Sequence, residues 1–158
     1  MEHSYFGKID LEEGIAELDP ISSADNEIAV EIDVEEDEPT TEDLDGLAEA
    51  CKNHADWTSK VIAKVIADYD DLLKDAFETW AEDDKSFPSN FNPGATSIQE
   101  VTPQQAAAKL QLAEIRMEVS EPTMIAFDFR FTLAEEMNYL VCGRFNCDGT
   151  LEEVNLES

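Results

Sequence analysis

The feature that most constrains the fold of this chain is a strict alternation of large apolar and small or polar residues between residues 125 and 133. Successive side chains of a β-strand point to opposite faces, so this pattern predicts a strand with one buried and one solvent-facing side. The apolar set is Ile125, Phe127, Phe129, Phe131 and Leu133. The four residues between them are Ala126, Asp128, Arg130 and Thr132.

Other segments share this period and predict further strands. The clearest is residues 26–35, NEIAVEIDVE, in which four β-branched residues alternate with small or acidic ones. Shorter strands are expected within residues 5–11 and 14–21, and longer ones around 115–119 and from 139 to the C-terminus. Asp148 and Gly149 predict a two-residue hairpin turn between the last two strands, with bends expected at Pro122 and at residues 134–138.

The middle of the chain has the period of helices. A Thr followed three residues later by an acid, in the stretch Thr40 to Asp43, is typical of a capping box that opens a helix. A second helix is expected from about Asp56 to Trp80, with a broad apolar face over about six to seven turns. Residues 83–97 predict a loop, and Thr102 before Pro103 predicts a short third helix through residue 110.

These elements predict the α+β fold class. An antiparallel sheet of about six to seven strands would pack against a helical pair inserted between the N- and C-terminal strands. At 158 residues the chain suits a single domain spanning residues 1–158.

The charge of the chain is strongly one-sided. Residues 32–45, IDVEEDEPTTEDLD, hold eight carboxylates and no basic residue, and the whole chain has 38 Asp and Glu against 10 Lys and Arg, a formal charge of −28. Repulsion makes naked nucleic acid and anionic membrane poor partners. A basic protein surface would be attracted, chiefly through a faster encounter at low salt. The sequence leaves the oligomeric state open.

The chain begins without the basic and apolar segments of a secretory leader, and it has no run of 18 apolar residues. We therefore expect a cytoplasmic protein. Its three cysteines, Cys51, Cys142 and Cys147, are an odd number without the spacing of a disulfide framework, so reduced thiols are expected.

Two parts of the chain resemble a known family. Residues 127–158, FDFRFTLAEEMNYLVCGRFNCDGTLEEVNLES, are similar to the ending of a bacterial family of unknown function catalogued under the number two thousand and four. The front half is similar as well, through FGKIDL at residues 6–11 and DYDDLLKDAFETW at residues 68–80. The similarity covers most of the chain, but its motifs are structural. It implies no catalytic or ligand-binding residue.

The sequence does not match the motifs of common metal and phosphate sites. A calcium loop aligned from Asp33 has Glu38 where its turn needs Gly and Leu44 where a bidentate Glu belongs. A zinc site lacks ligands at a suitable spacing around His3 or His54, and a Gly-rich phosphate loop is missing from the sequence. We expect neither a metal nor a cofactor, and no residue is singled out as catalytic. An enzyme that uses paired carboxylates in an unidentified pocket stays open as an alternative.

The function favoured by the sequence is non-enzymatic protein binding, and its sharpest form is an immunity-type protein that neutralises a basic toxin. A second alternative is a DNA mimic whose carboxylates imitate phosphates and occupy a DNA-binding protein. The candidate binding residues are exposed acids in two groups. The first is Glu35, Glu36, Asp37, Glu38, Glu42, Asp43 and Asp45. The second is Asp68, Asp70, Asp71 and Asp75.

Overall fold

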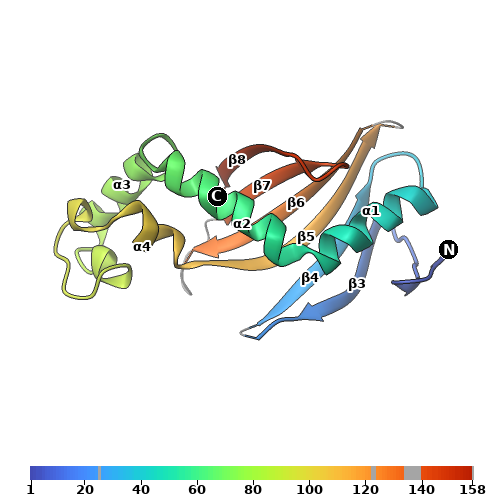
Figure 1. The fold of residues 1–158 in the computed structure, drawn as a ribbon, viewed down its shortest axis with the longest axis horizontal. Coiled ribbons are helices and arrows are strands. Elements are labelled where there is room, and N and C mark those ends of the chain that lie inside the picture. Colours follow the sequence, from blue (N-terminus) through green and yellow to red (C-terminus); the bar gives the residue numbers. More distant parts are fainter. Residues whose placement is uncertain (25, 122–123, 134–139, 158) are drawn as a thin grey trace.

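The structure is a computed structural model, and it describes residues 1–158 except 25, 122–123, 134–139 and 158. The chain opens with a small hairpin of β1 (Glu2–His3) and β2 (Gly7–Lys8). A second sheet follows, with six strands in chain order, and helices stand between its second and third members (Figure 1). Its strands are β3 (Ile15–Ser22), β4 (Glu27–Val34), β5 (Leu110–Glu121), β6 (Met124–Leu133), β7 (Leu140–Asn146) and β8 (Leu151–Glu157). The α+β class predicted from the sequence is confirmed.

The large sheet contains one parallel pair. β4 and β5 run parallel, with Glu31 opposite Arg116, whereas the other neighbouring strands are antiparallel. The chain leaves β4 at one end of the sheet, and the helical segment carries it across to the other end before β5 begins. A crossover of this kind returns the chain in the same direction. The expectation of a purely antiparallel sheet is therefore wrong at this pair.

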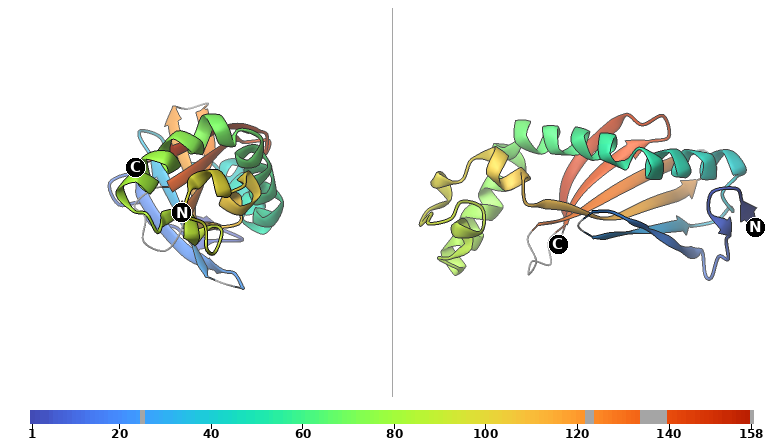
Figure 2. Two further views of the ribbon diagram at one scale, coloured as in Figure 1. Left: turned by 90° about the vertical axis from the view of Figure 1, so that its left-hand side faces the viewer. Right: turned by 60° about the horizontal axis from the view of Figure 1, so that its bottom comes forward.

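Helices α1 (Thr41–Lys52) and α2 (His54–Ala67) cover one face of the sheet (Figures 1 and 2). The predicted N-terminus of α1 is confirmed, because Thr40 and Asp43 form a reciprocal capping box. Helix α2 lies so close to Gly143 of β7 that a Cβ atom added to this glycine would stand 2.4 Å from Val61 of α2. Trp57 of α2 packs against Phe129 and Phe145, with ring centroids 5.5 and 4.7 Å away. The alternating aromatic residues thus hold the helices on the sheet.

The long second helix expected from Asp56 to Trp80 is interrupted. α2 ends at Ala67, a π-helical turn follows at Asp70–Lys74, and α3 (Asp75–Asp83) continues from it. A π-turn contains more residues than an α-turn, so it rotates the apolar stripe of the residues that follow. Phe77 packs on Phe87 and Phe91, which follow α3 in the chain. The hydrophobic period gave no sign of this change of partner.

Residues 70–107 form a helical lobe beyond the end of the sheet (Figure 2). Its segment from residue 83 to 97, expected to be a loop, contains a 3₁₀ turn at Phe87–Asn90 and buries Phe87 and Phe91. A second 3₁₀ turn lies at Ile98–Glu100. The predicted capping box of Thr102 is confirmed, but helix α4 (Pro103–Ala107) ends earlier than expected because the chain enters β5. The buried residues of lobe, helices and sheet form one contiguous core.

The turn between β7 and β8 differs from the expected two-residue turn. Asn146 and Thr150 are joined by a backbone hydrogen bond of 3.0 Å, so three residues form the loop. Gly149 has a φ of 86°, whereas Asp148 has no positive φ. A type I turn closed by a left-handed glycine fits this geometry. The expected bends at Pro122 and at residues 134–138 lie outside the described residues.

Candidate functional site

The face of the large sheet opposite the helices, hereafter the open face, carries charged side chains in register. A transverse row crosses five strands, each residue directly opposite the next. The row reads Glu31 on β4, Arg116 on β5, Asp128 on β6, Arg144 on β7 and Glu153 on β8. Directly opposite residues on neighbouring strands lie close enough to interact, and opposite charges there are stabilising.

Arg116 lies in the β4 half of this row. Its guanidinium is 3.0 Å from a carboxylate oxygen of Glu31, 3.1 Å from Glu114 and 3.9 Å from Asp33. Burial opposes the charge on Arg116, yet Glu114 and Glu31 outweigh that cost and raise its pKa. Burial also raises the pKa of the Glu31 carboxyl; Arg116 lowers it, and the nearby Glu114, Asp33 and Glu17 raise it further. Burial and three neighbouring carboxylates therefore oppose the negative charge of Glu31, and Arg116 favours it.

Arg144 forms the tightest contacts of the open face. It donates from Nε and Nη2 to the two oxygens of Asp128, at 2.8 and 2.9 Å, and from Nη2 to Glu118 at 2.6 Å. The Asp128 side chain is only 5% exposed. The hydrogen bonds that Arg144 donates to Asp128, followed by the charges of Asp128 and Glu118, raise the pKa of Arg144 against the opposing effect of burial. A bidentate pair of this kind fixes both side chains.

Arg130 completes the set. Its guanidinium lies 3.8 Å from Glu114 and 3.5 Å from Glu157. Arg116, Arg130 and Arg144 are the three arginines of the chain, and each is engaged by at least two carboxylates of this face. The arginines therefore balance the charge of carboxylates on the open face of the sheet. Sequence reasoning missed this network, although Asp128 and Arg130 on the polar side of the strongest predicted strand were a signal for it.

The first group of candidate residues, hereafter the acidic corner, surrounds the exit of β4 and the first turns of α1. Glu35, Glu36, Asp37 and Glu38 are exposed, as is Glu42. Within the part of the chain that the structure describes, these five side chains form no ion pair or hydrogen bond. Asp43 is used in the capping box with Thr40, and Asp45 accepts a hydrogen bond from His3 at 2.8 Å.

The second group, hereafter the helical patch, lies at the junction of α2, the π-turn and α3. Asp68 is 2.8 Å from Lys64, and Asp70 is 4.0 Å from Lys74. Asp71 and Asp75 are exposed. The helical patch therefore has lysine partners that the acidic corner lacks.

The structure does not bring the two groups together. The acidic corner lies at the N-terminal end of α1 and the helical patch follows the C-terminal end of α2, so both helices separate them (Figure 1). The 14 residues of α2 alone span about 21 Å at 1.5 Å per residue. That separation exceeds the screening length of about 8 Å at physiological salt. The acidic corner and the helical patch must therefore be treated as separate surfaces.

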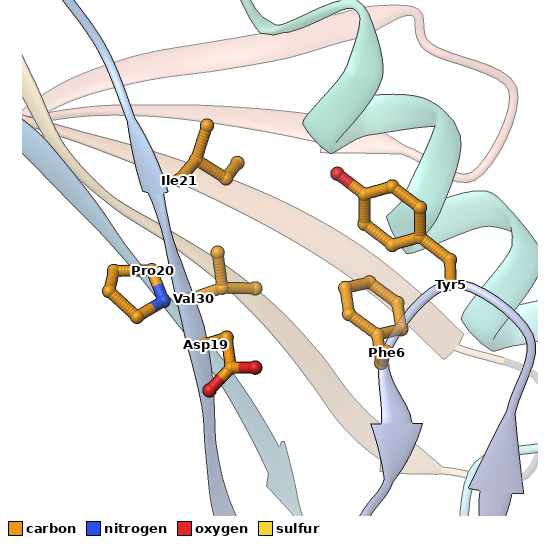
Figure 3. A pocket seen from close by; sticks show the side chains of 6 residues that line it. All are labelled: Tyr5, Phe6, Asp19, Pro20, Ile21 and Val30. Atoms are coloured by element: carbon orange, nitrogen blue, oxygen red, sulfur yellow. The ribbon is translucent and has the colours of Figure 1, made fainter.

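The N-terminal hairpin lies beside the acidic corner. The ring of His3 bridges two groups: its Nε2 meets Asp45, and its Nδ1 accepts the backbone N–H of Tyr5 at 3.2 Å. This arrangement requires the tautomer that carries its proton on Nε2. Next to the hairpin is a small pocket with a volume of about 180 Å³, lined by Tyr5, Phe6, Asp19, Pro20, Ile21 and Val30 (Figure 3).

Two of the three cysteines, Cys51 and Cys142, are buried in the folded protein. Burial raises the pKa of Cys51 to about 12. Burial, with the charges of Asp128 and Glu157, raises the pKa of Cys142 to about 12 as well. Thiolates are the reactive form, so both thiols are inert near neutral pH. Cys147 is exposed on the β7–β8 loop.

Over the described ranges, no three side chains of His, Cys, Asp or Glu are grouped so that they could hold a metal ion. None of the helices in those ranges is long and apolar enough to cross a membrane. The chain matches no family model, no curated protein and no solved structure. The resemblance to the bacterial family of unknown function stays a prediction.

Proposed function

We propose that this protein is an acidic, non-enzymatic binding domain for a basic protein in the bacterial cytoplasm. The observation that carries the proposal is the difference in how carboxylates are neutralised. The three arginines are engaged on the open face, while Glu35 to Glu38 project from the end of β4 and form no ion pair within the described residues. The negative charge of the acidic corner can therefore attract a cationic surface of another protein.

The negative field of the acidic corner would act mainly on the rate of association with the partner. Clustered like charges raise the local concentration of an oppositely charged partner and speed association, and salt reduces the effect. The sharpest form of the proposal is immunity: the partner is a basic toxin, and the acidic corner covers its cationic surface. A DNA-binding protein would be attracted by the same carboxylates, so the DNA-mimic alternative shares this surface.

The enzyme alternative finds less support. The pocket beside the N-terminal hairpin has a volume of about 180 Å³, below the range of about 300–1,000 Å³ typical of small-molecule sites. It presents one carboxylate, from Asp19, and not the pair that acid and base chemistry needs. This geometry suits a contact with one side chain better than a reaction.

The proposal is tested by capture from a lysate of the source cells at about 50 mM and about 400 mM salt. The Debye length shortens over this range, so attraction between exposed charges weakens. We expect a basic protein that binds at low salt and is released at high salt. Co-expression of the captured protein with this chain then tests neutralisation directly, because rescue of growth supports immunity. Competition by duplex DNA identifies a DNA-binding partner instead.

Two variants with equal charge change locate the contact. The corner variant carries Glu35→Gln, Glu36→Gln, Asp37→Asn and Glu38→Gln, and the patch variant carries Asp68→Asn, Asp70→Asn, Asp71→Asn and Asp75→Asn. We expect the corner variant to slow association with the captured protein about tenfold, and the patch variant to have a smaller effect because Asp68 and Asp70 already have lysine partners. Equal effects, or a partner that is indifferent to salt, would contradict the assignment to the corner.

A further inference from the structure

The small pocket beside the N-terminal hairpin combines aromatic rings with a carboxylate. Tyr5 and Phe6 form one wall, and the side chains of Asp19 and Ile21 from β3, with Val30 from β4, form the other (Figure 3). The Tyr5 side chain is exposed, Phe6 is half-buried, and Val30 is buried. The pocket therefore has an apolar floor, an aromatic side and an acidic rim.

Several contacts hold the hairpin wall of the pocket in place. His3 joins the hairpin to Asp45 of α1, and the terminal amino group of Met1 donates to the carbonyl of Ile9 at 3.1 Å. Phe6 packs edge-on against Tyr5 with ring centroids 4.8 Å apart. These contacts order the hairpin in the free protein, which lowers the entropy lost on binding.

The aromatic wall is already suited to a cation. The ammonium group of Lys52 lies 5.2 Å from the centroid of the Tyr5 ring, within the range of a cation–π contact. The charge of Lys52 is in turn balanced by Glu49 at 3.6 Å. A second cation at the pocket would meet the carboxylate of Asp19 and the rings of Tyr5 and Phe6.

We propose that this pocket receives one arginine side chain of the basic partner. An arginine has an apolar stem for the floor near Val30 and Ile21, a planar guanidinium that stacks on aromatic rings, and paired donors for the Asp19 carboxylate. The volume of about 180 Å³ suits one long side chain. The inference rests on the proposed function, and it adds a specific contact to the field of the acidic corner, which adjoins the hairpin through Asp45 and His3.

The test uses N-acetyl-arginine methylamide as the probe, titrated into the ¹⁵N,¹³C-labelled full chain and followed by NMR. We expect saturable shifts centred on Tyr5, Phe6, Ile21 and Val30, with a Kd on the order of millimolar because the ligand is small and the site partly exposed. Asp19→Asn should weaken binding about threefold to fivefold, the scale of an exposed ion pair. Tyr5→Leu should weaken it by a similar factor.

Glu27→Gln is the matched control, because Glu27 is exposed on β4 near the pocket but does not line it. It should leave the Kd unchanged. Shifts spread evenly over the acidic surface, or an Asp19→Asn variant that binds like the parent, would overturn the pocket assignment. If the pocket fails while the corner variant still loses the captured protein, the proposed function stands; if the pocket binds the probe but no basic protein is captured, the proposed function fails and the site remains.

Discussion

The two sides of strand β6 meet opposite surroundings. On the helix side, Phe127, Phe129 and Phe131 are fully buried, and Trp57 of α2 stacks on Phe129. On the open side, Arg130 belongs to a set of ion pairs that extends from β4 to β8, and Asp128 pairs with Arg144 beside it. One face is stabilised by the removal of apolar area from water, the other by charges that neutralise each other. This very acidic protein therefore uses its three arginines where strands lie side by side, whereas Glu35 to Glu38 of the acidic corner have no ion pair within the described residues.

The largest difference between the faces should appear in Phe129→Ala. Removing a fully buried Phe leaves a cavity, so we expect a loss of about 3–5 kcal/mol in the free energy of unfolding, measured by urea denaturation. Thr132→Ala, on the open side of the same strand, should change it by less than about 0.5 kcal/mol. If Phe129→Ala does not fold, Phe129→Leu provides a milder loss of about 1–2 kcal/mol. Similar values for Phe129 and Thr132 would break the comparison.

Gly143→Ala tests the closeness of the covered face. The added Cβ would stand 2.4 Å from a methyl group of Val61, so α2 must shift or the strand must bend. We expect a loss of about 1–3 kcal/mol in the free energy of unfolding. Val61→Ala removes the colliding methyl groups, so the double variant should be less destabilised than the sum of the two single changes. Additive losses would show that the contact is not the cause.

Asp128→Asn tests whether the open face contributes to stability. The change keeps the shape but removes the charge that Arg144 contacts through two hydrogen bonds. We expect a loss of about 1–2 kcal/mol, reduced from the value of a fully buried pair because the Arg144 side chain is 34% exposed. A double-mutant cycle with Arg144→Met should give a coupling energy of about 1 kcal/mol. A coupling energy near zero would mean that this ion pair does not contribute to the free energy of unfolding.

The smallest effect concerns pH and Glu31. Its pKa is raised in the folded protein above the ordinary value of 4.5, so its contribution to stability is present below that value and is lost as the pH rises through the folded pKa. Glu31→Gln removes this loss. Relative to the parent, the variant should therefore gain stability as the pH rises above about 4.5, by less than about 1 kcal/mol.

Urea unfolding at several pH values measures this gain, and Glu152→Gln, at an exposed position of β8, is the control with the same change of charge. A Glu31→Gln variant that follows the parent at every pH would show that Arg116 alone sets the behaviour of this carboxyl. The comparison between the faces would then be sharpened, since Arg116 would fully compensate the charge of Glu31.

The sequence by itself determined the local structure of this protein. The alternation at residues 125–133 located β6 and its buried face, and the capping boxes at Thr40 and Thr102 located two helix starts. It also located the exposed acids of the corner, because a run of like charges is stable only in water. These features depend on neighbours within a few residues, which the sequence displays directly.

Only the tertiary structure decided which distant residues meet. The parallel pairing of β4 with β5 sets Glu31 opposite Arg116, and the π-turn at Asp70–Lys74 directs Phe77 to the lobe. The pocket at Asp19 exists because the N-terminal hairpin docks beside β3. Strand order, register and docking are fixed by contacts between segments far apart in the chain, and periodicity along one segment carries no information about its partner.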